Sequence, residues 1–371
     1  MTSEQRTIAV TGSDGFIGRN LLTRLGEQGF ATHPIRRGTR PDDVRRILLA
    51  SDVVFHLAGV NRPSDPDEFE RSNCDYTRLI AKALADSKRA PLVVFSSSAK
   101  AEEPGEYGRT KRTAEDTLLD LAAKGATVAI LRLPNVFGKW ARPNYNSVVA
   151  TLCHNFARGL PVHIDDAGAA LTLLHIDDLV DHFLHLVAAP PRESGFVVPR
   201  PVYRTTVGAV AGHIASFADG RLCGRVEQVG SGLERALYAT FVSALPVEAC
   251  SYELAPKTDE RGSFTELLKT PASGQVSVLT SVPGATRGGH YHHSKVEKFV
   301  VAQGRARFRF RNIADGQTHE LETSGDRAVV VETIPGWTHD ITNVGDDLLI
   351  CVVWANEIFD PQRPDTVAMP L

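Results

Sequence analysis

The sequence predicts a two-domain protein in which an α/β domain with a doubly wound parallel sheet precedes an all-β barrel. The 371 residues exceed what one ordinary core accommodates. As far as Leu245, short apolar runs alternate with stretches of helical periodicity. From Cys250 onward, short alternating runs are separated by turn residues, the pattern of an all-β sandwich or barrel. We therefore expect domains at residues 1–245 and 246–371.

The composition limits the classes of function that the chain can have. Hydrophobic residues make up 42% and charged residues 23%, and the net charge of −3 argues against general binding of nucleic acid. No apolar run approaches 18 residues, and the polar first eight residues leave no room for a signal peptide, so we expect no membrane span. The five cysteines form no Cys-x-x-Cys pair, which is typical of reduced thiols in a cytoplasmic protein.

A glycine-rich turn, residues 11–18 (TGSDGFIG), joins the apolar run 8–10 to a stretch with helical spacing. Glycines let a pyrophosphate approach the backbone, and the helix that follows offers free N–H groups and the positive end of its dipole. The turn therefore predicts a Rossmann-type dinucleotide site, with a tight turn that binds no ligand as the alternative. The predicted cofactor contacts of this turn are Gly12, Ser13, Gly15, Phe16, Ile17 and Gly18.

The end of the second predicted strand, residues 31–35, indicates which nicotinamide cofactor binds. An acidic residue there would bind the ribose 2′-hydroxyl, whereas arginine accommodates a 2′-phosphate. Arg36 and Arg37 stand at this end without an acid. We therefore expect NADPH, and the alternative is that both arginines are solvated surface residues.

Two further strands lead to candidate site residues. One ends in His56-Leu57-Ala58-Gly59, where the small Ala58 and Gly59 would let a dinucleotide lie against the backbone. The other, residues 92–95, places a run of serines, 96–98, at the carboxyl edge of a parallel sheet, where ligands bind.

Tyr107 and Lys111 are spaced to share one face of a helix, one turn apart. A free tyrosine has a pKa of about 10. A cation one turn away, together with an oxidised nicotinamide, would lower that pKa by stabilising the phenolate. Tyr107 could then protonate a carbonyl oxygen as hydride arrives from the cofactor.

These segments together resemble the extended branch of the short-chain dehydrogenase/reductase superfamily. The resemblance implies that Leu57, Ala58 and Gly59 lie beside the adenine and ribose. It also implies that a serine orients the substrate carbonyl, with Ser98 as the better match and Ser97 as second choice. Only eight residues separate Ser98 from Tyr107, whereas the family has a longer loop.

Residues 132–138 (RLPNVFG) resemble the loop by which the same family enters its sugar-nucleotide pocket. The resemblance implies that Asn135 contacts the substrate. The polar residues that follow would suit a diphosphate and uracil, and the alternative is an ordinary connection. The candidate substrate residues are Asn135, Lys139, Arg142 and Tyr145.

The second domain contains the fixed positions of the first cupin motif, G-x5-H-x-H-x4-E-x6-G, between Gly284 and Gly304. His290 and His292 alternate on a strand, so both rings face one side. With Glu297 and His339 they form the ligand set of a first-row divalent metal. A metal-free barrel with hydrogen-bonded histidines is the alternative.

Residues 259–266 (DERGSFTE) resemble the entry strand of cupin epimerases that act on dehydro-deoxysugar nucleotides. That resemblance implies a sugar carbanion reaction, not an oxygenase.

The whole chain resembles the family of bifunctional capsular polysaccharide biosynthesis enzymes, including the stretches 137–140, 143–147, 262–266 and 359–361. The resemblance implies a homodimer with zinc in the cupin. It implies that the cupin epimerises carbon 3 of a UDP-4-keto-6-deoxy-2-acetamido-hexose. The reductase domain would then reduce carbon 4 with NADPH to UDP-2-acetamido-2,6-dideoxy-L-talose, towards UDP-N-acetyl-L-fucosamine. The alternatives are a reductase with a structural or dimerising cupin, and a non-enzymatic nucleotide-sensing protein.

Overall fold

The computed structural model describes residues 6–65, 67–87 and 90–371. The chain divides into two compact units. Unit 1 comprises residues 1–212 and 239–245, and unit 2 comprises residues 213–238 and 246–371. In the described part of the chain, no helix is long and apolar enough to cross a membrane.

A parallel sheet of six strands forms the centre of unit 1, as predicted. The order across the sheet is β2-β1-β3-β4-β5-β8, and every pair of neighbours is parallel. The strands are β1 (Thr7–Thr11), β2 (Ala31–Ile35), β3 (Val53–His56), β4 (Leu92–Ser98), β5 (Thr127–Leu133) and β8 (Gly195–Phe196). After β2 the chain runs through the helix Pro41–Ala50 to β3 on the other side of β1, so β2 is an edge strand of the sheet.

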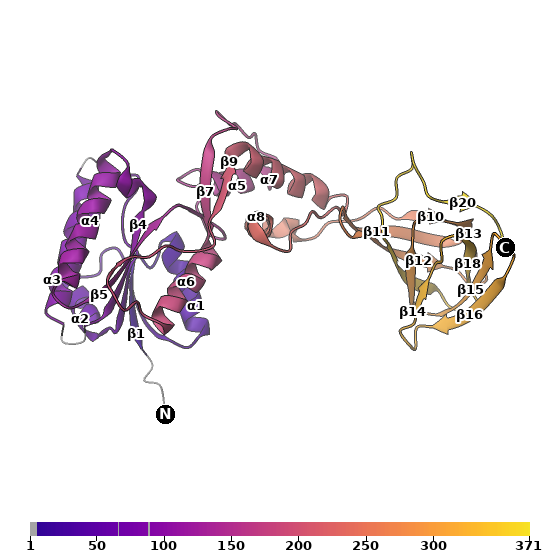
Figure 1. Cartoon of the computed structure of the whole chain (residues 1–371), viewed down its shortest axis with the longest axis horizontal. Coiled ribbons are helices and arrows are strands. Elements are labelled where there is room, and N and C mark those ends of the chain that lie inside the picture. Colours follow the sequence, from indigo (N-terminus) through magenta and orange to yellow (C-terminus); the bar gives the residue numbers. More distant parts are fainter. Residues whose placement is uncertain (1–5, 66, 88–89) are drawn as a thin grey trace, which may run out of the picture. The chain divides into compact units, whose positions relative to one another are not determined.

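Helices cover both faces of the sheet, as Figure 1 shows. One layer contains α1 (Phe16–Glu27) and α6 (Ile176–Ala188), and the other contains α2 (Pro41–Ala50), α3 (Tyr76–Ala85) and α4 (Glu106–Ala122). Alternate residues of one strand belong to different layers: Ile8 and Val10 pack with α1 and α6, whereas Ala9 packs with α2, α3 and α4. The inner strands β1, β3, β4 and β5 are therefore apolar on both sides, which explains their continuous hydrophobic runs, whereas the edge strand β2 is mostly exposed.

Shorter elements complete the part of the chain before residue 257. They are the π-helix η1 (Glu70–Asp75), the 3-10 helices η2 (Ala99–Glu102) and η3 (Val247–Cys250), the small sheet of β6 (Asn135–Phe137), β7 (Ala170–His175) and β9 (Tyr203–Thr206), and the helices α5 (Val148–Phe156), α7 (Val207–Arg221) and α8 (Gly232–Ser243).

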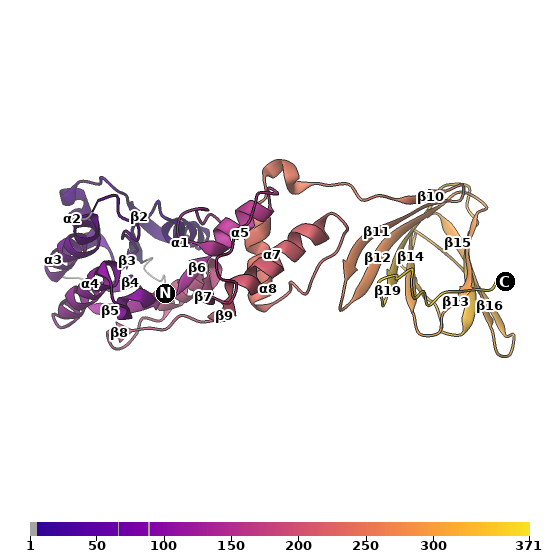
Figure 2. The ribbon, with the colours of Figure 1, turned by 90° about the horizontal axis from the view of Figure 1, so that it is seen from above.

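Unit 2 contains two antiparallel sheets that lie face to face (Figure 2). An apolar core that includes Phe299, Phe308 and Ile341 draws on both. The first sheet is β10 (Lys257–Asp259), β11 (Gly262–Thr270), β12 (Gly274–Ser281), β19 (Leu349–Ala355), β14 (Glu297–Gln303) and β17 (Val330–Glu332). The second is β16 (Thr318–Ser324), β15 (Arg305–Asn312), β18 (Trp337–Asn343), β13 (Thr286–Tyr291) and β20 (Val367–Ala368). The predicted all-β region is confirmed.

Candidate active sites

The glycine-rich turn lies against the end of β3. Gly12 has a φ of +66°, and a Cβ atom there would stand 2.7 Å from the backbone nitrogen of Ala58. Only glycine combines this backbone conformation with such a close approach. Ser13 is buried, and its hydroxyl donates to the carbonyl of Ile35 at 3.1 Å. The backbone of the turn is thus open to a ligand, while the Ser13 side chain braces β2.

A series of buried hydrogen bonds supports this turn. The Thr77 hydroxyl donates to the Asn73 carbonyl at 2.6 Å, so it accepts from Nε2 of His56 at 2.9 Å. Nδ1 of His56 therefore accepts from the Thr11 hydroxyl, also at 2.9 Å, and Thr11 accepts from the amides of residues 57 and 58. Burial, reinforced by nearby Lys111, lowers the pKa of His56 to about 3, so the ring is neutral.

The carboxyl edge of the sheet opens into a cavity of 790 Å³, within the usual size of a small-molecule site. Most of the residues predicted from the sequence are brought together in its lining. They are Gly12, Gly15, Phe16, Ile17, Gly18, Leu57, Gly59, Ser98, Tyr107, Lys111, Asn135, Arg142 and Tyr145. Ser13, Ala58, Arg36, Arg37 and Lys139 do not line this cavity.

Tyr107 and Lys111 stand on the first turns of α4 and face the cavity together. Burial raises the pKa of Tyr107, and a hydrogen bond with Ser98 opposes that rise. Lys111 donates from Nζ to the carbonyl of Ser96 at 2.9 Å. Burial lowers the pKa of Lys111 to about 8, against the opposing charge of Glu115. A Cβ atom at Gly59 would lie 3.2 Å from this Nζ, so glycine leaves room for the ammonium group.

The structure distinguishes between the two candidate serines. The Ser97 hydroxyl donates to Glu115 in the interior, whereas Ser98 interacts with Tyr107. Ser98 is therefore the serine placed beside the phenol. Its hydroxyl also accepts from the amide of Lys100 at 3.2 Å, at the start of η2.

Sequence reasoning missed Glu115 and its partner Arg132. Glu115 is 2% exposed and accepts from Nη2 of Arg132 at 2.6 Å. Arg132 also donates to Glu102 at 2.6 Å. Glu115 stands four residues after Lys111, and this helical spacing was the available signal. It is the buried carboxylate one turn from the lysine.

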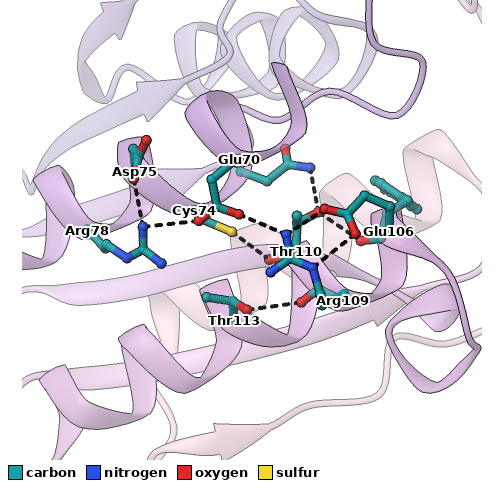
Figure 3. Close-up of polar contacts among 10 residues, drawn as sticks. Glu70, Cys74, Asp75, Arg78, Glu106, Arg109, Thr110 and Thr113 are labelled. Carbon is teal, nitrogen blue, oxygen red and sulfur yellow. Dashed lines mark hydrogen bonds and ion pairs between the residues drawn. The ribbon is translucent and has the colours of Figure 1, made fainter. Parts of the chain in front are cut away.

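The π-helix η1, also missed, holds the first turn of α4 in place (Figure 3). Nη2 of Arg109 donates to Glu70 at 2.9 Å and to Glu106 at 2.5 Å, and Arg78 donates to Glu70 at 3.2 Å. The ring of Phe69 lies 5.8 Å from that of Tyr107. Glu70 therefore connects η1 to the first turn of α4, and Phe69, the residue before η1, lies beside the tyrosine ring.

Other predicted residues have partners outside the cavity. Arg36 pairs with Asp14 at 3.2 Å and Arg37 with Glu68 at 3.3 Å, both as exposed groups beyond β2. Lys139 pairs with Asp177.

The cavity wall beyond Asn135 is rich in aromatic and cationic groups. The guanidinium of Arg142 lies 5.1 Å from the ring centre of Tyr145, and that of Arg62 lies 5.7 Å from it. Trp140 is 48% exposed at a φ of +69°, and its carbonyl accepts from Arg19 at 3.3 Å. These groups offer stacking surfaces and positive charge to a ligand.

Unit 2 brings together all four predicted metal ligands. One donor atom from each of His290, His292, Glu297 and His339 lies within 4.8 Å of the others. Nε2 of His292 and Nε2 of His339 stand 3.4 and 3.7 Å from Oε2 of Glu297. A tetrahedral ion with bonds of about 2.0–2.1 Å separates its ligands by about 3.3–3.4 Å, so this donor set fits a divalent metal.

The hydrogen bonding and protonation of the four cluster side chains suit a divalent metal ion. The Nε2 atoms of His292 and His339 are buried and make no hydrogen bond to the described residues. Burial, with nearby His339, lowers the pKa of His290 to about 4, which leaves that ring neutral. Burial favours the neutral form of Glu297, but its contacts with His292 and His339 and the charge of Lys295 outweigh this and hold its pKa well below the usual range.

A cavity of 210 Å³ opens beside the cluster, and Glu297 belongs to both. Polar and charged side chains dominate its lining. These are Lys257, Glu266, Gln275, Ser277, Lys295, Glu297 and Glu357, with Phe264, Val353, Ala355 and Phe359 as the apolar members. Of the four cluster residues, Glu297 lines this cavity, so the cavity adjoins the metal position.

The fold and the two sites define an NAD(P)-binding oxidoreductase joined to an antiparallel β domain with a metal-ligand cluster. Residues 8–198 match the NAD dependent epimerase/dehydratase family, and residues 257–367 match the polysaccharide biosynthesis C-terminal domain. The chain belongs to the NAD dependent epimerase/dehydratase family.

Two relatives are similar to this chain over nearly its whole length. UDP-2-acetamido-2,6-beta-L-arabino-hexul-4-ose reductase from Pseudomonas aeruginosa is 47% identical over 97% of this chain and 98% of its own length. The capsular polysaccharide assembling protein CapF from Staphylococcus aureus is 37% identical, with a TM-score of 0.89, over 98% of this chain and 100% of its own. The resemblance to capsular polysaccharide enzymes is thereby confirmed.

A more distant structure agrees in fold alone. Bordetella bronchiseptica WbmF, solved in complex with NAD+ and UDP, is 17% identical with a TM-score of 0.56. The match covers 64% of this chain and 92% of WbmF.

Proposed function

We propose that this chain is a bifunctional UDP-sugar enzyme. The cupin, residues 246–371, epimerises carbon 3 of a UDP-4-keto-6-deoxy-2-acetamido-hexose, and the reductase part, residues 1–245, reduces carbon 4 with NADPH. The product is UDP-2-acetamido-2,6-dideoxy-L-talose, on the route to UDP-N-acetyl-L-fucosamine for a capsular polysaccharide or O-antigen. The observation that carries the proposal is the presence in one chain of the Tyr107–Lys111 pair and the four-residue metal cluster.

In the reductase, NADPH bound at the glycine-rich turn would supply the hydride for carbon 4. Tyr107 protonates the carbonyl oxygen, Ser98 orients that oxygen, and the Lys111 ammonium favours the phenolate that remains. NADPH is favoured because Arg36 and Arg37 stand where an acid would select NADH.

In the cupin, His290, His292, Glu297 and His339 would hold a metal, which when bound would supply a Lewis acid to stabilise negative charge on a keto oxygen. The hydrogen at carbon 3 of a 4-keto sugar is acidic, so this centre can invert through an enolate. Reduction at carbon 4 removes that acidity and fixes the new configuration. The order of the two reactions is therefore epimerisation first and reduction second.

Zinc fits three imidazoles and one carboxylate. Zinc and a homodimer follow from the family resemblance, a cytoplasmic location follows from the cysteine pattern, and all three belong to this proposal. The intact ligand set supports an active cupin over one that only stiffens or dimerises the chain, and the intact Tyr107–Lys111 pair supports an enzyme over a nucleotide sensor.

The proposal is tested by incubating the protein with the UDP-4-keto-6-deoxy-2-acetamido sugar and NADPH, and by identifying the product by NMR. Inversion at carbon 3 together with an alcohol at carbon 4 is expected. An alcohol with the original carbon 3 configuration would support the alternative of a reductase with a structural cupin.

A further inference from the structure

We propose that the segment 365–370 supports the metal centre. Its backbone keeps the imidazole of His292 in the tautomer that can bind a metal. The carbonyl oxygen of Asp365 lies 2.5 Å from Nδ1 of His292. A carbonyl only accepts hydrogen bonds, so Nδ1 carries a proton, and in the neutral ring Nε2 keeps its lone pair. Nε2 is the atom that stands 3.4 Å from Glu297. The inference rests on the proposal that the cluster binds a metal.

The carbonyl of Asp365 is held in position by the side chain of the same residue. Its carboxylate accepts from three successive amides, at 2.9 Å from His293, 2.7 Å from Ser294 and 2.8 Å from Lys295. The Ser294 hydroxyl adds a fourth contact at 3.0 Å. Three converging N–H groups form a binding site for an anion. The segment is thus tied to the loop between β13 and β14, which carries His292 and leads into Glu297.

The residues after Asp365 cover the edge of β13, the strand that bears His290 and ends directly before His292. In β20, Ala368 pairs with His290 and Val367 with Tyr291, and the amide of Met369 donates to the Gly289 carbonyl at 2.8 Å. The Arg311 side chain fixes the Pro370 carbonyl at 2.8 Å. His290 and His292 are therefore both restrained by a segment more than 70 residues away in the sequence.

Groups behind a ligating histidine fix its tautomer and orientation, and their loss typically weakens metal binding about 10–100-fold. Without the carboxylate anchor, the Asp365 carbonyl would no longer be held against Nδ1. The His292 ring could then turn or protonate at the wrong nitrogen, so part of the metal affinity would be lost.

The test measures the affinity of the full chain for Zn²⁺ by competition with a chelating dye. Asp365→Ala is expected to weaken binding by about 10–100-fold, and Asp365→Asn by less because it keeps one acceptor oxygen. Asp360→Ala is the matched control, because that exposed carboxylate only caps its own turn through the Gln362 amide at 2.9 Å. The control should bind Zn²⁺ as the unmodified chain does.

A second readout is independent of metal. The imidazole ¹⁵N shifts of His292 in the metal-free protein should report a proton on Nδ1, and Asp365→Ala should change them. Unchanged Zn²⁺ affinity in both Asp365 variants, or a proton on Nε2 in the unmodified protein, would overturn the inference while leaving the proposed function intact. Failure of the unmodified chain to bind Zn²⁺ would instead reject the metal centre itself.

Discussion

The Nζ atom of Lys111 lies 2.9 Å from the carbonyl oxygen of Ser96, deep at the carboxyl end of β4. The contact links helix α4 to the central strand β4 and holds the ammonium group of Lys111 in one position. Because Lys111 is buried there, its pKa falls to about 8, and its charge becomes sensitive to conditions near neutrality.

The rate of reduction should therefore depend on the charge of Lys111. As the pH rises through about 8, Lys111 loses its proton, the phenolate of Tyr107 loses its partner, and kcat/KM for ketone reduction should fall. Glu115 raises the pKa of Lys111, so Glu115→Gln should move this fall to lower pH. Identical pH profiles for the two proteins would show that Glu115 does not influence the lysine.

Removing the proton donor should separate the two activities. Tyr107→Phe is expected to reduce kcat for NADPH oxidation by roughly 10²–10⁴-fold, the usual contribution of a positioned acid. Affinity for the cofactor should change little. In deuterium oxide the variant should still exchange the hydrogen at carbon 3, as followed by NMR. Retention of most of the reduction rate would show that another group donates the proton.

Cofactor preference should depend on Arg36. Loss of a charge-assisted hydrogen bond costs about 1.5–3 kcal/mol, so Arg36→Ala should raise KM for NADPH by roughly 10–100-fold. KM for NADH should stay nearly unchanged. Equal kinetic constants for NADH and NADPH in the unmodified enzyme would contradict the proposed selectivity.

Loss of the metal cluster should stop the exchange reaction without affecting cofactor binding. His290→Ala, or treatment with a chelator, should abolish deuterium incorporation at carbon 3, because the enolate loses its stabilising charge. Binding of NADPH, measured by fluorescence, should be unaffected. Undiminished exchange in His290→Ala would mean that the metal is structural and that the base and its stabiliser lie elsewhere.

Acid should destabilise the protein partly through His56. Its pKa is 6.5 in the reference state and about 3 in the folded protein, so the unfolded chain takes up the proton first. Stability from this residue is present above about pH 6.5 and is lost as the pH falls towards 3, at up to about 1.4 kcal/mol per pH unit. His56→Gln should be less stable at pH 7 and should lose less stability on acidification, as measured by urea unfolding.

Local features of the fold and of both sites could be predicted from the sequence. The parallel strands were visible as continuous apolar runs because both faces are covered by helices. The pair Tyr107 and Lys111 is detectable because helical periodicity places both residues on one face. His290 and His292 are detectable from the spacing of the metal motif, although only His290 lies in β13 and His292 begins the loop that follows. The structure brings each pair to a cavity or cluster.

Partners that are distant in the sequence could not be predicted in the same way. Arg132 neutralises Glu115, and Asp365 binds the loop after His292, and no periodicity links these positions. Lys139 was expected to contact substrate, yet it pairs with Asp177, and the motif gives no signal of that acid. Such contacts depend on tertiary packing, which a single sequence does not reveal.

The two cavities share no residue among those described, and each is lined from a different unit of the chain. Two chains that are damaged at different sites should therefore complement one another. A mixture of Tyr107→Phe and His290→Ala proteins retains one intact centre of each kind. If the epimerised ketone diffuses between molecules, such a mixture turns substrate into alcohol although neither protein does so alone.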